Sequence, residues 1–375
     1  WRPFCGRGQH HDRLLPRGAR KAAGVGGDPA GNSKQTFRIH GLRTGNHVNS
    51  YLERLAIRLA IAMAELDSET RARHAQWLLA RQREDGGFSG REGESDLYYT
   101  SFGLRGLSVL GELNGEPAER AATFLKGKLT SQQTIIDFLS LIYSGFMLDT
   151  SAGIDIFADS AVDWPDAVAE TLELLRREDG GYAKGPDGHA SSTYHSFLVT
   201  ICLQLLERLP PNPESLTQFI YSQAAEDGGF LEIRAGKRAG TNPTAAAIGT
   251  LQILGGIHED IRQQTIDFLA DMQTDEGGLR ANTRIPIADM LSSFTGLLTL
   301  YDLNGEDEVD RRQILTYARS LEVAEGGFFG AVWDQAADVE YTFYCLGTLA
   351  LFLDTVSLPT LPLSPHRLPA SPFHV

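Results

Sequence analysis

Cysteine is scarce in this chain, which has only Cys5, Cys202 and Cys345 among its 375 residues. The three positions show no paired spacing, so the sequence excludes a disulfide framework of the kind that holds small secreted domains together. Unpaired cysteines are typical of a reducing compartment. We therefore expect a cytoplasmic protein.

Positive charge is also in short supply, with 34 Lys and Arg against 48 Asp and Glu and a formal net charge of −14. Residues 1–45 hold nine basic and two acidic residues, so residues 46–375 hold 25 basic and 46 acidic residues, a net charge of −21. Such a surface repels nucleic acid, which excludes that class of partner. We expect residues 1–45 to be a disordered or non-homologous basic arm and the proline-rich residues 357–375 to be an unstructured tail.

Long hydrophobic runs are missing as well. The most apolar segments, Thr244–Gly256, Leu291–Tyr301 and Tyr341–Leu353, contain no charged residue but have only 11 to 13 residues. A helix that crosses a bilayer needs about 20 residues, so we expect no transmembrane segment. A short helix without charge is instead predicted to be buried nearly all round.

Glycine, by contrast, is abundant, and it occurs in pairs at regular intervals. The chain contains five such motifs: DGGF at Asp85–Phe88, DGGY at Asp179–Tyr182, DGGF at Asp227–Phe230, EGGL at Glu276–Leu279 and EGGF at Glu325–Phe328. Their first glycines are 94, 48, 49 and 49 residues apart. The first interval is about twice the others, which indicates a degenerate unit near residue 133 and a total of six units.

Each unit is predicted to contain two helices of different character. Ile314, Tyr317, Ala318 and Leu321 fall at i, i+3, i+4 and i+7 before a glycine pair, which indicates an amphipathic helix. The apolar helix follows the pair. The alternation predicts an all-α fold, with apolar helices in an inner ring and amphipathic helices around them. We expect each glycine pair to end an outer helix, the next aromatic residue to anchor the turn, and the loops to surround a central cavity.

The repeated "Q-x-x-DGGF" and "D-x-x-Y-T" patterns, over about 300 residues, resemble the prenyltransferase and squalene-cyclase repeat family, which folds as an (α/α)6 toroid. The D-x-D-D acid motif of hopene-type cyclases is absent. Residues 280–294 and 331–343 are similar to the two final units of protein prenyltransferase β subunits, with the Rab geranylgeranyl transferase as the nearest type.

This resemblance implies a toroid over residues 46–356 and the transfer of an isoprenoid, geranylgeranyl or farnesyl, from its diphosphate to a protein cysteine. It also implies an α subunit and a protein or peptide acceptor as partners. The alternative is a non-catalytic toroid that binds an isoprenoid or a partner peptide in the same cavity.

The resemblance further implies a zinc ion that binds the acceptor as thiolate. The family takes its ligands from an Asp and a Cys two residues apart and from a His one unit later. Asp289 matches the first ligand, whereas Leu291 and Tyr341 stand at the Cys and His positions. The zinc ligand set is therefore incomplete, and the protein could function without the metal. Asp338 matches the Asp that opens the sixth inner helix of the family, where it is not a ligand.

Two further residues are considered as ligands or as ordinary interior residues. Cys345 lies one helical turn beyond Tyr341, and His195 has the same offset from its glycine pair as Tyr341 has. If they are not ligands, Cys345 is a small buried residue of an inner helix and His195 is a hydrogen-bonded residue that lines the cavity. Besides His195 and Tyr341, aromatic residues are predicted to line an apolar pocket for the isoprenoid: Tyr98, Tyr99, Tyr194, Phe294 and Trp333.

Basic residues interrupt the acidic character of the chain in two loops. In the family, the loops before the fourth and fifth inner helices hold the diphosphate. The corresponding segments "LEIRAGKRAGTN" and "LRANTRIPIAD" contain Arg234, Lys237, Arg238, Arg280 and Arg284. Together with the positive ends of the inner helices, these residues are predicted to bind the diphosphate.

Overall fold

The computed structural model describes residues 50–130 and 134–353. This part of the chain contains thirteen α-helices, one 3-10 helix η1 (Glu306–Glu308) and one small antiparallel sheet of β1 (Tyr182–Ala183) and β2 (Ser191–Ser192). The all-α class predicted from the sequence is confirmed. The predicted arm at 1–45 and the predicted tail at 357–375 lie outside the described residues.

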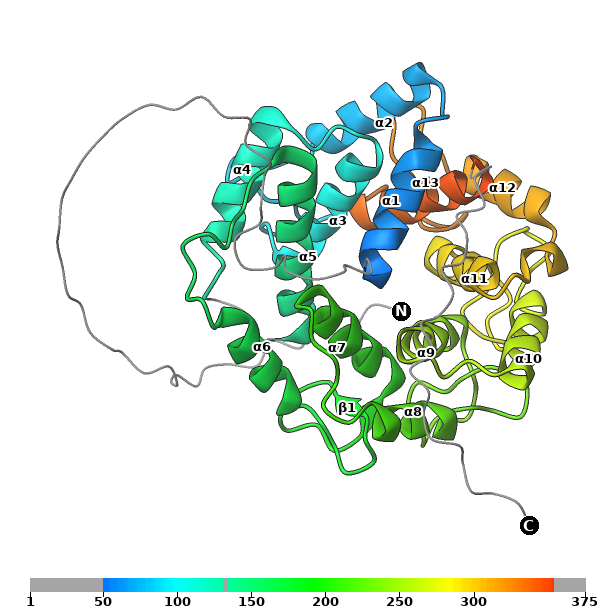
Figure 1. The fold of residues 1–375 in the computed structure, drawn as a ribbon. Coiled ribbons are helices and arrows are strands. Elements are labelled where there is room, and N and C mark those ends of the chain that lie inside the picture. Colours follow the sequence, from blue (N-terminus) through cyan, green and yellow to red (C-terminus); the bar gives the residue numbers. More distant parts are fainter. Residues whose placement is uncertain (1–49, 131–133, 354–375) are drawn as a thin grey trace, which may run out of the picture. The chain divides into compact units, whose positions relative to one another are not determined.

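The apolar helices form a closed inner ring, as predicted (Figure 1). Each one packs against the next, and the last packs against the first. The six helices are α3 (Leu97–Val109), α5 (Ile135–Ala152), α7 (Thr193–Leu205), α9 (Thr241–Leu254), α11 (Met290–Asp302) and α13 (Val339–Leu353). Apart from Arg105 of α3, their central residues lack charge because both faces of each helix are covered by other helices.

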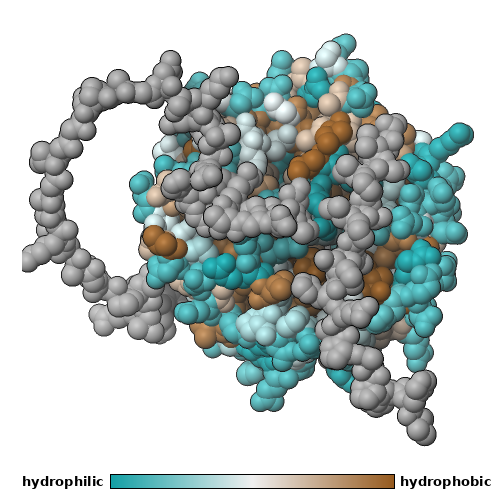
Figure 2. Space-filling view, in the orientation of Figure 1, coloured by the Kyte–Doolittle hydropathy of each residue, from teal (hydrophilic) through white to brown (hydrophobic). Residues whose placement is uncertain are grey.

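The amphipathic helices surround this ring. They are α2 (Ser68–Leu79), α4 (Gly115–Lys126), α6 (Trp164–Glu173), α8 (Pro213–Ser222), α10 (Glu259–Ala270) and α12 (Arg311–Ser320). The predicted inward positions of α12, among them Ile314 and Ala318, are fully buried. In the space-filling view hydrophilic residues dominate the outer helices, whereas apolar residues gather toward the middle (Figure 2).

The glycine pairs do not end the outer helices, and that prediction was wrong. α2 ends at Leu79, its cap Ala80 is right-handed, and Gly86 follows in a separate turn with a φ of 88°. A Cβ atom on Gly86 would lie 2.1 Å from the backbone oxygen of Arg120 in the next outer helix. The pair therefore serves a turn that touches the neighbouring unit, where only glycine fits.

The residue after each glycine pair anchors its turn in the core, as predicted. Phe88 is fully buried, and its backbone N–H donates to Thr100 Oγ1 at 2.9 Å. Four other units repeat this bond with a Ser or Thr of the following inner helix: Tyr182 with Ser196, Phe230 with Thr244, Leu279 with Ser293, and Phe328 with Thr342. A buried hydroxyl in the first turn of each of these inner helices thus fixes the turn that precedes it.

The last unit closes onto the first through a histidine. In the glycine motifs that begin with Asp, the Asp carboxylate accepts a hydrogen bond from the N–H of the second glycine, as Asp85 does from Gly87 at 3.0 Å. In the last unit His74 of α2 takes this place, with its Nδ1 accepting from the N–H of Gly327 at 3.1 Å. The other ring nitrogen of His74 lies 3.2 Å from Glu322.

Helix α1 (Tyr51–Met63) lies across the ring, where it packs on α3, α7 and α13. The N–H of Tyr51 donates to Gln204 at 2.8 Å, and its hydroxyl donates to Asp302 at 3.2 Å. Gln204 and Asp302 stand at the C-terminal ends of α7 and α11. α1 therefore covers the C-terminal end of the inner ring, and the predicted site lies at the opposite end.

Helix α5 is the one described helix that is long and apolar enough to cross a membrane by length and composition. It has 18 residues, of which 56% are buried inside the protein. It packs on α3, α4 and α7, so its apolar character serves the core of the ring.

Candidate functional site

The N-terminal ends of the inner helices form a rim in which neighbouring units overlap. The first N–H of an inner helix donates to a carbonyl in the loop of the next unit. Three such bonds, each 2.9 Å long, join Thr193 to Glu232, Thr241 to Ala281 and Met290 to Gly330. The loops before α9, α11 and α13 are thereby held side by side at this rim.

The predicted diphosphate-binding residues divide into two groups. Arg234, Lys237, Arg238 and Arg284 are exposed on the loops before α9 and α11, and the structure gives their side chains no hydrogen bond or ion pair with another described residue. Arg280 is half-buried, and its Nη2 donates to the backbone oxygen of Asp271 at 2.9 Å. Four cations are therefore available at the rim, while the fifth supports the loop.

The second residue of each inner helix except α5 belongs to a layer of side chains at this rim. It stands two positions before the buried hydroxyl that fixes the turn. This layer, named here the mouth ring, consists of Tyr98, Tyr194, Asn242, Leu291 and Glu340. Tyr98 donates to Glu340 at 2.7 Å, and Asn242 accepts from Thr295 of α11 at 2.7 Å, so this layer links adjacent inner helices.

Asp289 acts as the N-cap of α11. Its Oδ1 accepts from the N–H of Ser292 at 2.8 Å, and its Oδ2 accepts from the hydroxyl of the same residue at 2.9 Å. Asp338 caps α13 in the same way, by accepting from the N–H of Tyr341 at 2.9 Å, and it also pairs with Arg91 at 3.0 Å. The carboxylate that resembles a zinc ligand is therefore one of a series of helix caps in this repeat.

Leu291 and Tyr341, at the family's Cys and His positions, lie close to Asp289. Met290, next to Asp289, binds Gly330, and Gly330 lies against the ring of Tyr341. Leu291 offers no donor atom. Burial, together with the carboxylates of Glu340 and Asp289, raises the pKa of Tyr341, so its phenol stays neutral.

This set of residues does not fit zinc. The metal needs donors at about 2.0 to 2.3 Å, and an engaged cap, an aliphatic side chain and a neutral phenol do not supply them. Within residues 50–130 and 134–353, no group of three His, Cys, Asp or Glu side chains is arranged to hold a metal ion.

Cys345 and His195 have the character of interior residues. Cys345 is fully buried with its Sγ 4.0 Å from the backbone oxygen of Phe329, and burial raises the pKa of its thiol well above the ordinary value. The Nδ1 of His195 lies 2.8 Å from the hydroxyl of Ser192. Burial, aided by Lys184, lowers the pKa of His195 to about 4, so this histidine is neutral at pH 7.

Aromatic side chains fill the ring below the mouth. Phe102 packs edge-on against Tyr98 and Tyr344, with 5.0 and 5.3 Å between ring centroids, and Tyr344 packs in a tilted arrangement on Phe294 at 5.7 Å. Tyr99 joins the same cluster through Tyr98. Tyr341 also packs on Tyr344, at 6.2 Å between ring centroids, so four of the predicted lining residues are part of one aromatic wall. Trp333 differs, because it is 64% exposed in the loop before α13.

Two charged residues of the interior were not predicted from the sequence. Arg105 of α3 stacks over the rings of Phe102 and Tyr143, at 4.6 and 4.8 Å from their centroids. Glu340 accepts from Tyr98, and burial raises the pKa of its carboxyl to about 7. Glu340 is the one charged residue of α13, and the uncharged run Tyr341–Leu353 begins one residue after it.

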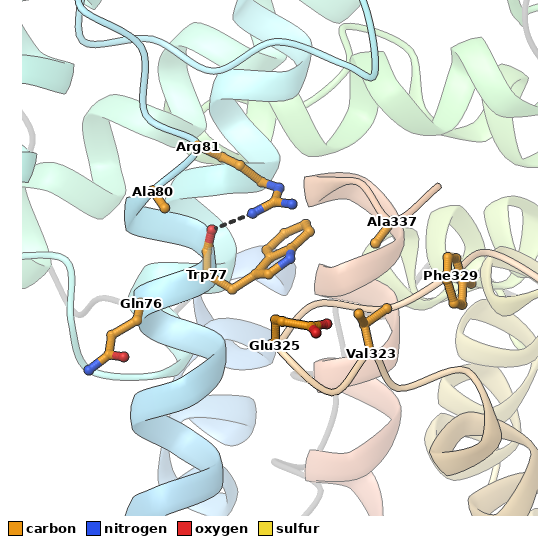
Figure 3. Close-up of a pocket in the computed structure, with 8 residues that line it drawn as sticks. All are labelled: Gln76, Trp77, Ala80, Arg81, Val323, Glu325, Phe329 and Ala337. Carbon is orange, nitrogen blue, oxygen red and sulfur yellow. Dashed lines mark hydrogen bonds between the residues drawn. The ribbon is translucent and has the colours of Figure 1, made fainter. Parts of the chain in front are cut away.

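Two cavities in the described residues lie away from the mouth ring. A cavity of about 510 Å³ opens at the seam of the first and last units, where Arg81 stacks on Trp77 (Figure 3). It is lined by Gln76, Trp77, Ala80, Arg81, Val323, Glu325, Phe329 and Ala337. The second, of about 10 Å³, lies inside the ring between α1 and Arg105 and is about large enough for one water molecule.

Comparison with known proteins agrees with this architecture. Residues 59–126 and 121–359 match the prenyltransferase alpha-alpha toroid domain family. The chain is 25% identical to the protein farnesyltransferase subunit beta of Pisum sativum over 194 residues. The match covers 50% of this chain and 45% of that protein, so the chain spans less than half the length of this relative.

Solved structures with the same fold perform different chemistry. Candida albicans protein geranylgeranyltransferase-I complexed with GGPP is similar with a TM-score of 0.58 at 16% identity, over 75% of this chain and 91% of that chain. A variant of the type II terpene cyclase MstE from Scytonema, bound to geranylgeranyl dihydroxybenzoate, has a TM-score of 0.51 at 11% identity. The match covers 80% of this chain and 98% of that chain. An alpha-1,6-mannanase from a Salegentibacter species has a TM-score of 0.52 at 13% identity, over 80% of this chain and 99% of that chain. Likeness at this level shows the fold alone.

Proposed function

This chain belongs to the prenyltransferase alpha-alpha toroid family, and on that premise we propose that it transfers an isoprenoid from its diphosphate to a protein cysteine, as a protein prenyltransferase β subunit does. The observation that carries this proposal is the group of exposed cations, Arg234, Lys237, Arg238 and Arg284, on two adjacent loops of an otherwise acidic protein. They stand beside the N-termini of inner helices, whose dipoles also attract anions.

The proposed division of labour follows from the chemistry of the reaction. The rim cations hold the diphosphate and stabilise the negative charge that it gains as it leaves. The aromatic wall formed by Tyr98, Phe102, Phe294 and Tyr344 contacts the hydrocarbon chain. An isoprenoid would displace aromatic side chains as it enters, because the rings of this wall contact one another. A geranylgeranyl or farnesyl donor, an α subunit and a cytoplasmic location are parts of the same proposal.

A non-catalytic toroid that binds an isoprenoid or a peptide is the second candidate. The misfit of Asp289, Leu291 and Tyr341 to zinc favours it, because the family uses that metal to activate the acceptor thiol. The two candidates share the binding of the isoprenoid diphosphate and differ in the transfer.

Calorimetric titration with farnesyl and geranylgeranyl diphosphate, followed by a transfer assay with thiol acceptors, tests both candidates. Binding with transfer supports the enzyme, whereas binding without transfer supports the second candidate. The absence of binding to either diphosphate would overturn both.

A further inference from the structure

We propose that Glu340 accepts the proton of the acceptor thiol, in place of the metal that Asp289, Leu291 and Tyr341 do not fit. The inference rests on the proposed transfer function and assigns a proton-accepting group to it. Three observations carry it: the place of Glu340 in the mouth ring, its hydrogen bond to Tyr98, and the misfit of the zinc positions.

The side chain of Glu340 is directed to the interior of the ring. Its Oε1 accepts from the hydroxyl of Tyr98, which belongs to the neighbouring inner helix α3. Its charge also acts on Tyr194 of α7, which is not a neighbour of α13 in the ring. The hydrogen bond to Tyr98 places the carboxyl of Glu340 between α3 and α13, at the end of the inner helices where the rim loops lie.

Glu340 also stands close to the place where the family resemblance puts the zinc-bound thiolate. Leu291, at the family's Cys position, and Glu340 are the second residues of the neighbouring helices α11 and α13. Tyr341, at the family's His position, is the next residue after Glu340. A thiol that enters this part of the mouth ring meets no metal ligand set but does meet a carboxyl group.

The surroundings of Glu340 suit a group that both holds and releases a proton. Burial disfavours its charge, and Asp338 acts in the same direction, whereas Tyr98, Arg105 and Tyr344 favour the charge. Tyr194 and Tyr341 also lie within its electrostatic range and are neutral phenols at pH 7. The result is a carboxyl pKa of about 7. A thiol has a pKa of about 8.5, so proton transfer to this carboxylate is only slightly uphill.

The proposed step balances without a metal or a redox partner. The S–H bond of the acceptor breaks, and its proton passes to the Glu340 carboxylate. The thiolate sulfur then forms a bond to C1 of the isoprenoid, while the bond between C1 and the diphosphate oxygen breaks. The diphosphate leaves with the bonding electron pair and is held by the rim cations, and Glu340 later returns its proton to water.

The test compares Glu340→Gln with wild type in isoprenoid diphosphate binding and in transfer to small thiols. The amide keeps the size of the side chain and an oxygen acceptor for Tyr98 but cannot take a proton. We expect unchanged diphosphate affinity and a loss of about 100-fold in the transfer rate at pH 7. The wild-type transfer rate should rise as pH increases through about 7, and this rise should be absent in the Glu340→Gln variant. Glu94→Gln, on an exposed loop before α3, serves as the matched control and should behave as wild type.

A series of acceptor thiols sharpens the result. With a thiol that is already ionised at pH 7, no proton needs to be accepted, so the defect of Glu340→Gln should shrink to within a few fold. Glu340→Asp, which keeps a carboxyl group, should retain more activity than Glu340→Gln. An equal defect with ionised and un-ionised thiols would reduce Glu340 to a structural role, and a wild-type rate in Glu340→Gln would remove it from the reaction. If wild type binds the diphosphate but transfers nothing, the proposed enzyme function falls and this inference falls with it.

Discussion

His74 and Gly327 are joined by a hydrogen bond of 3.1 Å although 253 residues separate them in the chain. The bond joins the second helix of the described chain to the last glycine turn, so it closes the outer layer of the toroid. Because Nδ1 accepts the N–H of Gly327, the proton of the neutral ring must sit on Nε2, which faces Glu322 at 3.2 Å. Protonation at Nδ1 would break this link.

Stability should therefore fall at low pH through His74. Burial lowers the pKa of His74 below its usual value, with Glu322 opposing the shift and Arg73 adding to it. The unfolded chain then takes up the proton more readily, so the contribution of His74 is full above about pH 6.5 and is lost as pH falls through the lowered folded pKa. In His74→Asn, whose amide oxygen also accepts from Gly327, the decline in melting temperature between pH 7 and 5 should be smaller than in wild type. His189→Asn, on an exposed loop, should leave the decline unchanged. An identical decline in wild type and His74→Asn would contradict this role of the histidine.

Replacing Gly86 by alanine should destabilise the protein far more than replacing Gly93. Both residues have positive φ, 88° and 95°, so both substitutions carry a strain of about 1 kcal/mol. Only at Gly86 would the new Cβ lie 2.1 Å from a backbone oxygen, whereas at Gly93 nothing lies within 4 Å. Gly86→Ala should cost on the order of 3 kcal/mol or more in denaturant unfolding. Equal losses in the two variants would show that close approach to Arg120 is unimportant.

Removing two rim cations should weaken diphosphate binding. Arg234→Ala combined with Arg238→Ala should raise the dissociation constant for geranylgeranyl diphosphate at least about tenfold, because each charged contact contributes roughly 1.5 to 3 kcal/mol. Its dependence on salt should flatten, since fewer charges remain to be screened. Arg312→Ala, on the exposed face of the outer helix α12, removes a charge outside the two basic loops and should have no effect. Undiminished affinity in the double variant would show that these side chains are solvated loop charges.

Restoring the family's ligand types should create a metal site. Leu291→Cys with Tyr341→His adds a thiolate and an imidazole beside Asp289 at the adjoining starts of α11 and α13. Zinc content, measured by elemental analysis, should rise from near zero to about one per chain and should increase with pH as the thiol ionises. Each single variant still lacks one donor, so it should bind much less zinc than the double variant. Stoichiometric zinc in the unmodified protein would overturn the conclusion that its residues do not fit the metal.

The sequence was sufficient for features that repeat and that depend on neighbours along the chain. The period of about 48 residues, the two helix types and the buried positions of α12 follow from local apolar spacing, because a helix must bury its apolar face wherever it packs. The aromatic anchors were predicted for the same reason. The glycine turns were misassigned, because the requirement for glycine at residue 86 comes from Arg120, a residue of the next unit.

The candidate site was only partly predictable. Sequence resemblance located Asp289, Leu291, Tyr341 and the basic loops, but it could not show that Asp289 is engaged as a helix cap. Glu340 acquires its raised pKa from burial and from the nearby charge of Asp338, and no local pattern encodes that environment.

By itself, then, the sequence determined six helix pairs, an acidic surface with two basic loops and an incomplete set of zinc ligands, since these properties belong to residue types and their spacing. The tertiary structure alone decided how the first and last units meet through His74, which end of the ring α1 covers, and which side chains face one another in the mouth ring. Those relationships depend on contacts between residues as distant as His74 and Gly327 or Tyr98 and Glu340. Such contacts form only when the ring closes, because closure brings the two ends of the repeat to within hydrogen-bonding distance.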